Sequence, residues 1–233
     1  MIKAILMDFN GVIIDDERIQ LEILRGLLDA DGIAITDEQY FANLGMDDRA
    51  FVASAYEFAG LTPETNKILE ISQQKTLKWR DTVASEVPLF PGMEEFIRKM
   101  ARDFELGLVS MSKREEVEFV LEMTDLRQFF SVIVTAEEVS NHKPDPECYR
   151  KAFQQIDLVR IGQGHLPMTH AECVVIEDSP AGVMAGRNAD LQVLGVANTV
   201  APVELRKAGA RWVAADLNDW MPDSVRLSFA AKI

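Results

Sequence analysis

Short runs of apolar residues recur along the chain and are separated by segments of helical length. The runs lie at residues 2–9, 106–110, 132–135, 173–176, 193–197 and 212–215. A continuous apolar run of this length is typical of a strand buried on both faces, so we expect six such strands. The segments between them carry helix-start signals: Ser112 and Glu115 have the spacing of a capping box, and a serine stands directly before Pro180. This alternation predicts an α/β fold with a Rossmann-like parallel sheet as its core.

Residues 16–85 interrupt the alternation. This segment shows helical periodicity without a convincing strand, and an apolar stripe along one face is formed by Ile19, Ile23, Leu24, Leu27 and Leu28. We therefore expect an inserted all-helical cap domain at residues 16–85. Residues 1–15 and 86–233 then form the α/β core domain, and the apolar, proline-containing stretch at 87–92 is the return linker.

The charge balance of the chain is strongly acidic. The 233 residues include 24 Lys and Arg against 38 Asp and Glu, which gives a formal net charge of −14. Such a surface repels the backbone of DNA and RNA, so we expect no nucleic-acid partner, and an anionic substrate needs a local positive site. The two cysteines make no disulfide framework. No apolar run is long enough for a membrane span or a signal peptide, which predicts a cytoplasmic protein without a membrane partner.

Polar residues follow several of the predicted strands at the point where each strand ends. They are Asp8 after the first run, Ser110 at the end of the second, and the pair Glu177 and Asp178 after the fourth. Ligands of parallel sheets bind at the carboxyl ends of the strands, so we expect a functional site here. Taken alone, Asp8 is equally well explained as a turn or helix cap. Ser112, two residues after Ser110, is better explained as the cap of the next helix.

Two adjacent carboxylates after an apolar strand are unfavourable to bury unless a cation joins them. Glu177 and Asp178 offer oxygen ligands with no histidine beside them, so Mg²⁺ is the cation we expect. Lys143 stands directly before Pro144 and just ahead of a helix start, which favours a positioned charge. A solvated surface lysine is the alternative at that position.

In this order, the four motifs resemble those of the haloacid dehalogenase superfamily, in its branch of β-phosphoglucomutases and small phosphate-ester phosphatases. The resemblance spans about residues 2–216, including the helical insertion after the first motif. It implies Mg²⁺-dependent phosphoryl transfer, which needs in-line positioning and positive charge against developing negative charge. The expected partner is then a small phosphorylated metabolite, and we expect a monomer or a weak homodimer.

The resemblance also implies roles for individual residues. Asp8 matches the nucleophile that becomes an aspartyl phosphate, and Lys143 matches the lysine that neutralises charge on the nucleophile and the phosphate. The phosphate-binding positions are matched by Ser110, Met111 and Ser112. The Mg²⁺ ligands are matched by Asp8, Glu177, Asp178 and the backbone carbonyl of Asn10.

Asn10 departs from the family pattern, because phosphatases and mutases of this branch carry an aspartate, the general acid/base, two positions after the nucleophile. An amide cannot transfer a proton, and general acid–base help is typically worth about 10²–10⁴-fold. Three explanations stay open: an engineered replacement of an original aspartate, an enzyme for good leaving groups such as acyl or aryl phosphates, or a phosphometabolite-binding pseudoenzyme. We favour a phosphatase, with a sugar-phosphate mutase as the alternative. The halide-removing branch needs no metal, and the acidic pair argues against it.

Substrate selection is expected from the cap. Arg49 lies in a predicted cap loop or helix start, where it could grip a second anionic group of the substrate. An ion pair of Arg49 with Asp48 or Glu57 is an equally good explanation. Lys75 lies in a polar helical stretch, for which solvent exposure is the simpler expectation. The natural substrate does not follow from these residues.

Overall fold

Six parallel strands form the centre of this computed structural model, which describes residues 1–218 and 220–230. The strands pair in the order β3-β2-β1-β4-β5-β6, and each described pairing is parallel. Each strand lies inside a predicted apolar run or extends one residue beyond it, so the α/β prediction is confirmed. The strands are β1 (Ala4–Met7), β2 (Glu105–Val109), β3 (Val132–Val134), β4 (Cys173–Glu177), β5 (Gln192–Val196) and β6 (Trp212–Ala214).

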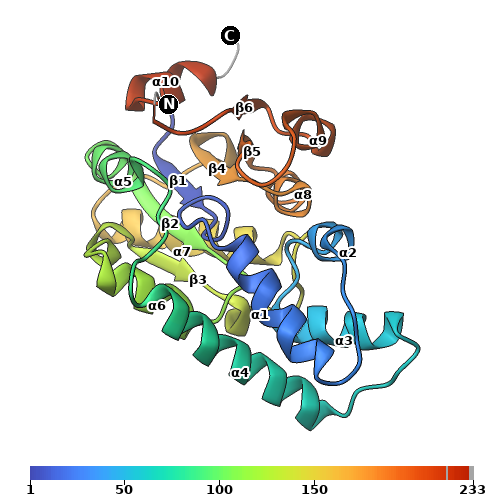
Figure 1. The fold of residues 1–233 in the computed structure, drawn as a ribbon. Helices are drawn as coiled ribbons and strands as arrows, with labels where there is room; N and C mark the ends of the chain where they lie inside the picture. The colour runs from blue at the N-terminus through green and yellow to red at the C-terminus, as the bar shows by residue number, and fades with distance from the viewer. Residues whose placement is uncertain (219, 231–233) are drawn as a thin grey trace.

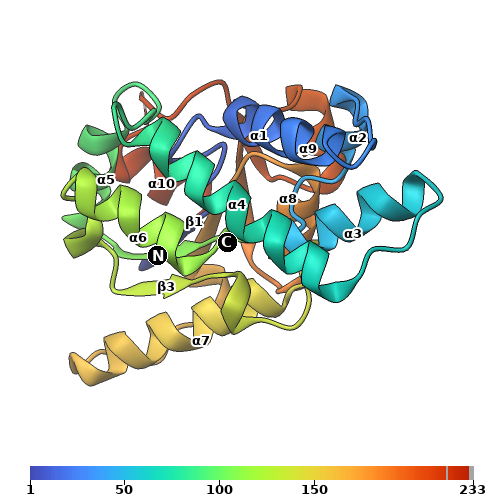
Figure 2. The ribbon, with the colours of Figure 1, turned by 60° about the horizontal axis from the view of Figure 1, so that its bottom comes forward.

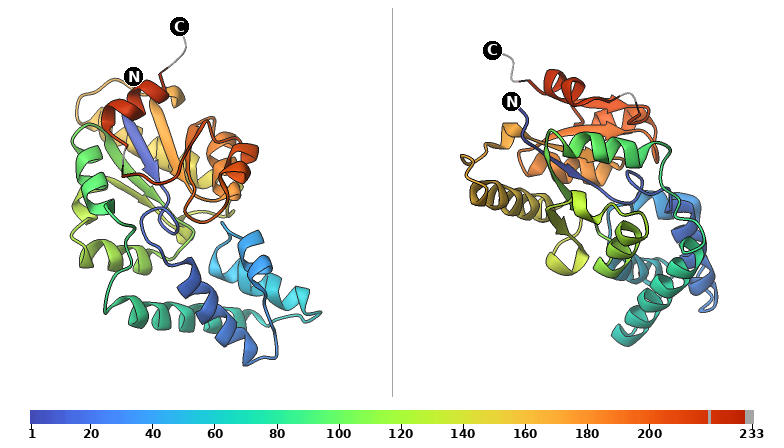
Figure 3. Two further views of the ribbon diagram at one scale, coloured as in Figure 1. Left: turned by 45° about the horizontal axis from the view of Figure 1, so that its top comes forward. Right: turned by 90° about the vertical axis from the view of Figure 1, so that its left-hand side faces the viewer.

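Helices cover both faces of the sheet (Figures 1 and 3). On one face, Ile5 and Met7 share an apolar cluster with α5 (Met93–Ala101), α6 (Arg114–Met123) and α10 (Pro222–Ser228). On the other face, Ala4 and Leu6 share a cluster with α7 (Glu147–Gly162), α8 (Pro180–Asn188) and α9 (Pro202–Ala208). Successive strand residues point to opposite faces, so a strand covered on both sides needs apolar side chains at every position. This explains the uninterrupted apolar run at β1.

Residues 16–85 contain four helices and turns. The helices are α1 (Glu17–Asp29), α2 (Asp37–Ala42), α3 (Asp48–Phe58) and α4 (Thr65–Val83). They enclose an apolar cluster of their own that includes Leu24, Val52 and Ile71. Helix α4 packs against α1 and α3 and also against α6 of the sheet layer (Figure 2). The four helices lie beyond the carboxyl ends of the strands, whereas the N-terminus and α10 lie at the opposite end (Figures 1 and 3).

The strand order determines where a ligand binds. The chain builds the sheet outwards from β1 to β3 and then returns to add β4 on the other side of β1. In open α/β sheets, ligands bind in the crevice outside the carboxyl ends at such a reversal. Asp8 directly follows β1, and its backbone N–H donates to the carbonyl oxygen of Ile176 in β4 at 3.0 Å. The first predicted site residue therefore lies at the reversal point.

Helix α8 begins as the sequence predicts. The Ser179 side chain accepts a hydrogen bond from the backbone N–H of Gly182 at 3.0 Å, and Pro180 is the first helical residue. This cap fixes the turn between β4 and α8, and with it the backbone that carries Glu177 and Asp178.

Short 3₁₀ helices complete the secondary structure of the described residues. They are η1 (Arg127–Phe129), η2 (Ala136–Glu138) and η3 (His170–Glu172). Among the helices of the described residues, none combines the length and the apolar character needed to cross a lipid bilayer.

Candidate active site

Three charged side chains meet at the carboxyl end of the sheet. The Nζ of Lys143 lies 2.7 Å from Asp8 Oδ1 and 2.6 Å from Glu177 Oε1. All three residues are buried, and Lys143 is only 3% exposed. The loop that carries Lys143 lies between η2 and α7, so three separate segments of the chain converge here. Lys143 is therefore a positioned charge and not a solvated surface lysine.

Glu177 is saturated with hydrogen bonds from the protein. Its Oε1 accepts from Lys143 and from the hydroxyl of Tyr149, the latter at 2.9 Å. Its Oε2 accepts from the backbone N–H groups of the next two residues at 3.0 and 3.2 Å and from the Ser179 hydroxyl at 3.1 Å. A Cβ at position 182 would lie 1.7 Å from Oε1, so Gly182 is required there. Glu177 thus orients both Lys143 and the turn between β4 and α8.

Asp178 retains an oxygen without a donor. Its Oδ2 is buried and has no hydrogen-bond partner. Asp8, Glu177 and Asp178 each offer one oxygen, and these oxygens lie within 4.8 Å of one another. Gly11 keeps the space open, because its φ is +73° and a Cβ there would lie 1.9 Å from Asp178 Oδ2. A buried, unpartnered carboxylate oxygen within a set of oxygen ligands fits a hard divalent cation such as Mg²⁺.

The charges in this cluster perturb one another. Burial raises the pKa of Asp8 to about 7; the Glu177 charge adds to the rise, and Lys143 opposes it. Burial also raises the pKa of Asp178, with the charges of Glu177 and Asp8 adding to the effect. Burial by itself would lower the pKa of Lys143, but Asp8 and Glu177 outweigh it and the net shift is upward. Lys143 is therefore a permanent cation, and a further cation beside the two aspartates would favour their ionised forms.

The side chain of Asn10 is held at both ends. Its Nδ2 donates to both carboxylate oxygens of Asp16 at 3.0 Å. Its Oδ1 accepts from the hydroxyl of Ser112 at 2.7 Å and from that of Ser110 at 3.3 Å. The structure thus brings together Asn10 and the two serines that the sequence assigns to phosphate binding. Ser110 is fully buried behind Asn10, whereas Ser112 also lines the pocket described below.

The prediction that Ser112 caps the following helix is wrong. Helix α6 begins at Arg114, and Lys113 occupies the cap position without a capping hydrogen bond from its own side chain. The Glu137 carboxylate accepts from the backbone N–H of Arg114 at 3.0 and 3.1 Å instead. The Ser112 hydroxyl donates instead to Asn10, which lies 102 positions earlier in the chain. A buried tertiary acceptor has therefore replaced the local capping interaction.

Asp16 is a candidate site residue that sequence reasoning missed. It is fully buried and accepts hydrogen bonds from Gln20 Nε2 at 2.9 Å and Trp79 Nε1 at 2.8 Å, in addition to those from Asn10. All of these partners are donors, which suits an ionised, acceptor-only carboxylate. Burial raises the pKa of Asp16 to about 6, and the donated hydrogen bonds limit that rise. The available signal was the acidic run at residues 15–17, directly after the first motif.

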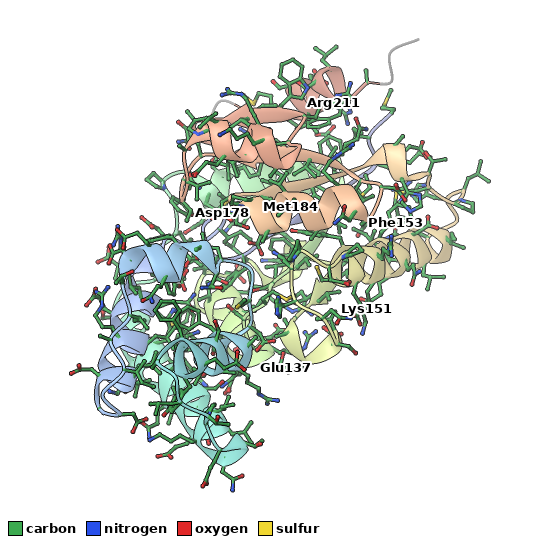
Figure 4. All side chains as sticks on the ribbon, turned by 90° about the vertical axis from the view of Figure 1, so that its right-hand side faces the viewer. Glu137, Lys151, Phe153, Asp178, Met184 and Arg211 are labelled. Carbon is green, nitrogen blue, oxygen red and sulfur yellow. The ribbon has the colours of Figure 1, made fainter. Side chains whose placement is uncertain are left out.

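A pocket opens beside Asp8 between the core and helices α1–α3, and we call it the Asp8 pocket. Asp178 lies on the side of the core that faces these helices (Figure 4). Within the pocket, the hydroxyl of Tyr40 donates to Glu17 Oε2 at 2.6 Å, and burial, with the Asp16 charge, raises the pKa of Glu17 to about 8. The described residues that line the Asp8 pocket are Asp8, Asn10, Glu17, Gln20, Leu24, Tyr40, Asn43, Leu44, Gly45, Met46, Asp47, Asp48, Phe51, Met111, Ser112, Lys143, Asp178 and Ser179.

Arg49 does not line the Asp8 pocket. It is exposed and lines an adjoining cavity together with Lys113. The two cavities share Asp47, Asp48 and Met111. Asp48, one of the expected ion-pair partners of Arg49, is instead paired with Lys75 at 3.1 Å. Arg49 therefore lies near the candidate site but not at the position of the reacting group.

The expected solvent exposure of Lys75 is wrong. Lys75 is fully buried, and its Nζ lies 3.1 Å from Asp48 Oδ1 and 3.2 Å from Glu116 Oε1. The hydroxyl of Thr76 donates to the same Glu116 oxygen at 2.8 Å. Helix α4 packs against α6, so the polar face that periodicity assigns to solvent forms the contact between the helical segment and the sheet layer.

Comparisons with known proteins agree with this arrangement. A family model described as haloacid dehalogenase-like hydrolase matches residues 5–196. The phosphorylated carbohydrates phosphatase of Thermotoga maritima is 25% identical over 201 residues, which are 85% of this chain and 87% of that protein. The chloroplastic protein SUPPRESSOR OF QUENCHING 1 of Arabidopsis thaliana is 26% identical over 94% of this chain, but the match spans only 20% of that longer protein.

A solved structure shares the fold over nearly the whole length. The β-phosphoglucomutase of Clostridium difficile matches with a TM-score of 0.84 at 20% identity, covering 98% of this chain and 97% of that chain. The family match includes β1 with Asp8, the Lys143 loop, and β4 with Asp178. This chain therefore belongs to the haloacid dehalogenase-like hydrolases.

Proposed function

We propose that this chain is a Mg²⁺-dependent phosphatase that acts on a small phosphorylated metabolite through an aspartyl phosphate on Asp8. The observation that carries the proposal is the position of Asp8, 2.7 Å from Lys143 Nζ and within 4.8 Å of carboxylate oxygens of Glu177 and Asp178. Phosphoryl transfer needs a positioned nucleophile and positive charge around the transferred group. The names of the two relatives, a phosphatase of phosphorylated carbohydrates and a β-phosphoglucomutase, support a phosphorylated sugar as substrate.

Residues 16–85 act as a cap domain in this proposal, and residues 1–15 and 86–233 form the catalytic core. Helix α1 contributes Glu17 and Gln20 to the Asp8 pocket, and the start of α3 contributes Asp48. Asp8, Lys143 and Asp178 come from the core side of the same pocket. The phosphoryl group then binds against the core, and the remainder of the substrate contacts the cap.

The proposed reaction has two steps at Asp8. A carboxylate oxygen of Asp8 bonds to phosphorus while the bond from phosphorus to the leaving oxygen breaks, and that oxygen keeps the electron pair and takes a proton from solvent. Lys143 neutralises negative charge on Asp8 and on the phosphoryl oxygens. Mg²⁺ held by Asp8 and Asp178 would supply further positive charge against the transferred group. Water then cleaves the aspartyl phosphate, which releases inorganic phosphate and restores Asp8.

Asn10 limits which substrates react well. Its amide cannot donate a proton to the leaving oxygen or take one from the attacking water, and such help is typically worth about 10²–10⁴-fold. The carboxylate or phenolate released from an acyl or aryl phosphate departs without a proton donor, so these compounds can still phosphorylate Asp8. Hydrolysis of the aspartyl phosphate has no carboxylate at position 10 to assist it, so we expect this intermediate to accumulate.

The decisive experiment supplies a reactive phosphoryl donor such as acetyl phosphate with Mg²⁺ and follows the intact mass of the protein. We expect a phosphate adduct on the unmodified chain, absent from Asp8→Asn, with slow release of inorganic phosphate. The Lys143→Met variant should form the adduct more slowly, because it keeps the nucleophile and removes the cation beside it. If the unmodified chain forms no adduct and releases no phosphate, the proposed chemistry is wrong.

A second candidate function is the binding of a phosphometabolite without turnover. The fixed amide of Asn10 favours it, because the group that would exchange protons in this branch is hydrogen-bonded on both sides. Calorimetry with a panel of phosphate esters separates the two candidates. Tight binding without an adduct and without released phosphate would support the binding protein.

A further inference from the structure

The leaving oxygen of an alkyl phosphate needs a proton that the Asn10 amide cannot supply. Among the described residues that line the Asp8 pocket, the titratable groups of the core are Asp8, Lys143 and Asp178. In the proposed function, Asp8 is the nucleophile and Asp178 holds the metal, and Lys143 is already paired with Asp8 and Glu177. The remaining candidates for a proton donor come from the helical segment, and they are Glu17, Tyr40, Asp47 and Asp48.

The two aspartates at the start of α3 are held as acceptors. Asp47 Oδ1 accepts from the backbone N–H groups of Arg49 and Ala50 at 2.8 and 3.0 Å, so Asp47 caps the helix. Asp48 Oδ1 lies 3.1 Å from Lys75 Nζ. Burial raises the pKa of Asp48, but the Lys75 charge opposes that rise. Both side chains are therefore engaged with donors as carboxylates, which have no proton to give.

Tyr40 and Glu17 share one hydrogen bond. The hydroxyl of Tyr40 donates to Glu17 Oε2 at 2.6 Å, so its hydrogen is engaged, and burial raises the pKa of Tyr40 well above its usual value. Glu17 is half-buried, and the bond to Oε2 leaves its Oε1 to carry a proton. Of the two residues, Glu17 is the one with an acidic hydrogen available to the pocket.

Negative charge around Glu17 favours its neutral form. Burial, together with the charges of Asp16 and Asp8, raises the pKa of Glu17 to about 8. The hydrogen bond from Tyr40 in α2 and the charge of Lys75 in α4 oppose that rise. At neutral pH, Glu17 is therefore mostly a carboxyl group that can donate a proton.

Glu17 also acts on the reacting groups of the core. It lines the same pocket as Asp8 and Asp178. The Asp8 charge adds to the raised pKa of Glu17, and the Glu17 charge adds to that of Asp178. Charge effects weaken with distance, so Glu17 lies near both residues. A phosphoryl group bound at Asp8 then has Glu17 on its cap side.

We propose that Glu17 donates the proton to the leaving oxygen, in place of a carboxyl group at position 10. An oxygen of Asp8 bonds to phosphorus while the bond from phosphorus to the ester oxygen breaks. The ester oxygen keeps the electron pair and takes the proton of Glu17, and the Glu17 carboxylate then regains a proton from solvent. This inference rests on the proposed function, because it takes Asp8 as the site of phosphoryl transfer.

The proton donor assists only the first of the two steps. Hydrolysis of the aspartyl phosphate needs a group that takes a proton from water. With a pKa of about 8, Glu17 regains its own proton at neutral pH, so its carboxylate is the minor form when water attacks. The aspartyl phosphate therefore accumulates from alkyl phosphates as well as from reactive donors.

The first test compares two aromatic phosphates of similar size. Nitrophenolate departs from 4-nitrophenyl phosphate without a proton, whereas the benzyl alcohol of benzyl phosphate needs one. Glu17→Gln keeps the size of the side chain and an acceptor for Tyr40. With Mg²⁺, this variant should lower kcat/KM at least about tenfold for benzyl phosphate and less than about twofold for 4-nitrophenyl phosphate. A packing or substrate-contact role would lower both values alike.

The pH dependence assigns the proton to this side chain. For the unmodified chain, kcat/KM with benzyl phosphate should fall above about pH 8, where Glu17 loses its proton. The fall should be absent in Glu17→Gln and absent with 4-nitrophenyl phosphate. Tyr40→Phe keeps the ring that packs against Phe41 and Phe51 and removes a bond that favours the carboxylate. The fall should then move to higher pH, a shift that structural damage does not produce.

Two further variants provide controls. Glu22→Gln is the same substitution on the exposed side of α1, outside the described lining of the pocket, and should change neither substrate. Asn10→Asp restores a proton donor at position 10. In that background, Glu17→Gln should lower kcat/KM for benzyl phosphate less than about threefold, because the donor is no longer unique.

The remaining outcomes separate this inference from the proposed function. If 4-nitrophenyl phosphate phosphorylates Asp8 but Glu17→Gln reacts with benzyl phosphate as fast as the unmodified chain, only this inference fails. A fall above pH 8 that disappears in Asp48→Asn and survives in Glu17→Gln would assign the proton to Asp48 and overturn it. If Glu17→Gln does not fold, an unchanged fall in Tyr40→Phe overturns it. If no donor phosphorylates Asp8, the proposed function fails and this inference fails with it.

Discussion

Asn10 and Asp16 face each other as an amide and a carboxylate, with Asn10 Nδ2 3.0 Å from both oxygens of Asp16. Gln20 and Trp79 donate to the same carboxylate and hold it in place. The Asn10 amide is therefore oriented with its NH₂ group towards Asp16 and its oxygen towards Ser112. Positions 10 and 16 form a matched pair, because a carboxylate at position 10 would meet a second carboxylate at position 16.

The first prediction concerns this pair. Asn10→Asp places two carboxylates in contact, and one of them must keep a proton because like charges this close do not both ionise. Asn10→Asp combined with Asp16→Asn restores an amide partner and lets the new carboxyl group titrate at lower pH. Both variants should hydrolyse alkyl phosphates about 10²–10⁴-fold faster than the unmodified chain, the usual range of general acid–base help. In pH profiles of kcat/KM, the single variant should show the higher apparent pKa.

Asp16→Asn alone is the control for the pair. This variant places an amide at position 16 opposite the Asn10 amide. An amide has one acceptor oxygen where the Asp16 carboxylate has two, so the donors from Asn10, Gln20 and Trp79 cannot all be satisfied. We expect it to lower the free energy of unfolding by about 1–3 kcal/mol without a gain in turnover. Identical pH profiles for the single and double variants would contradict the coupling between the two positions. No gain in either would contradict a general acid/base role at position 10.

The second prediction concerns stability without metal. The pKa of Asp8 rises from 3.8 to about 7 and that of Glu17 from 4.5 to about 8, chiefly because the buried Asp8 and the half-buried Glu17 are withdrawn from water. Between about pH 4 and pH 8 the folded chain thus binds more protons than the unfolded chain, so the free energy of unfolding falls as pH rises through this window. In EDTA, the Tm should be higher at pH 6 than at pH 8.

Mg²⁺ should reverse this trend. It binds the ionised carboxylates, so its stabilising effect is larger at pH 8, where fewer protons compete. We expect Mg²⁺ to raise the Tm by at least about 2 °C more at pH 8 than at pH 6, which for a chain of this size corresponds to about 1 kcal/mol. Thermal melts of Asp178→Asn provide the control, since this variant should lose most of the Mg²⁺ effect. An equal rise in Tm with Mg²⁺ at both pH values would contradict binding of Mg²⁺ to the carboxylates of Asp8 and Asp178.

The fold followed from local patterns because its strands are buried on both faces. Ile5 packs against one helical layer and Leu6 against the other, so the whole of β1 is apolar and stands out in the sequence. The cap of α8 was equally local, since Ser179 bonds a backbone N–H only three residues away. Signals whose physical cause lies within a few residues could be interpreted without coordinates.

The rest of the site depends on partners far away in the chain. The spacing of Ser112 suited a capping box, but Asn10 supplies a buried acceptor that no local pattern reveals. Periodicity likewise separated a polar face of α4 from an apolar one, but it could not show that this polar face contacts Glu116 of α6 and is closed to solvent at Lys75. The partners of Asp16 were hidden for the same reason, since Trp79 follows it by 63 positions.

The third prediction concerns the buried ion cluster between the helical segment and the sheet layer. Lys75 compensates Asp48 and Glu116, and Lys75 and Glu116 are each no more than 1% exposed. Lys75→Met leaves two carboxylates without their cation, and we expect it to lower the free energy of unfolding by about 3–5 kcal/mol. The double variant Lys75→Met/Glu116→Gln also lacks one of the two unpaired carboxylates, so it should recover part of the lost free energy of unfolding. Urea unfolding measures both values; a loss below about 1 kcal/mol for Lys75→Met would contradict the buried pairing.

The fourth prediction uses a pair of glycines. A Cβ at position 11 would lie 1.9 Å from Asp178 Oδ2, and the φ of Gly11 is +73°, where a side chain costs about 1–2 kcal/mol. Gly11→Ala should therefore displace the Asp178 carboxylate and weaken Mg²⁺ binding by at least about tenfold, since a ligand is lost.

Gly26→Ala is the matched control: it lies inside α1 with open space around it, and alanine there should stabilise the helix by up to about 1 kcal/mol. Calorimetric titration with Mg²⁺ compares the two variants. Unchanged Mg²⁺ affinity in folded Gly11→Ala would mean that Asp178 does not bind the metal, because the new methyl group and a coordinating Oδ2 cannot occupy the same space.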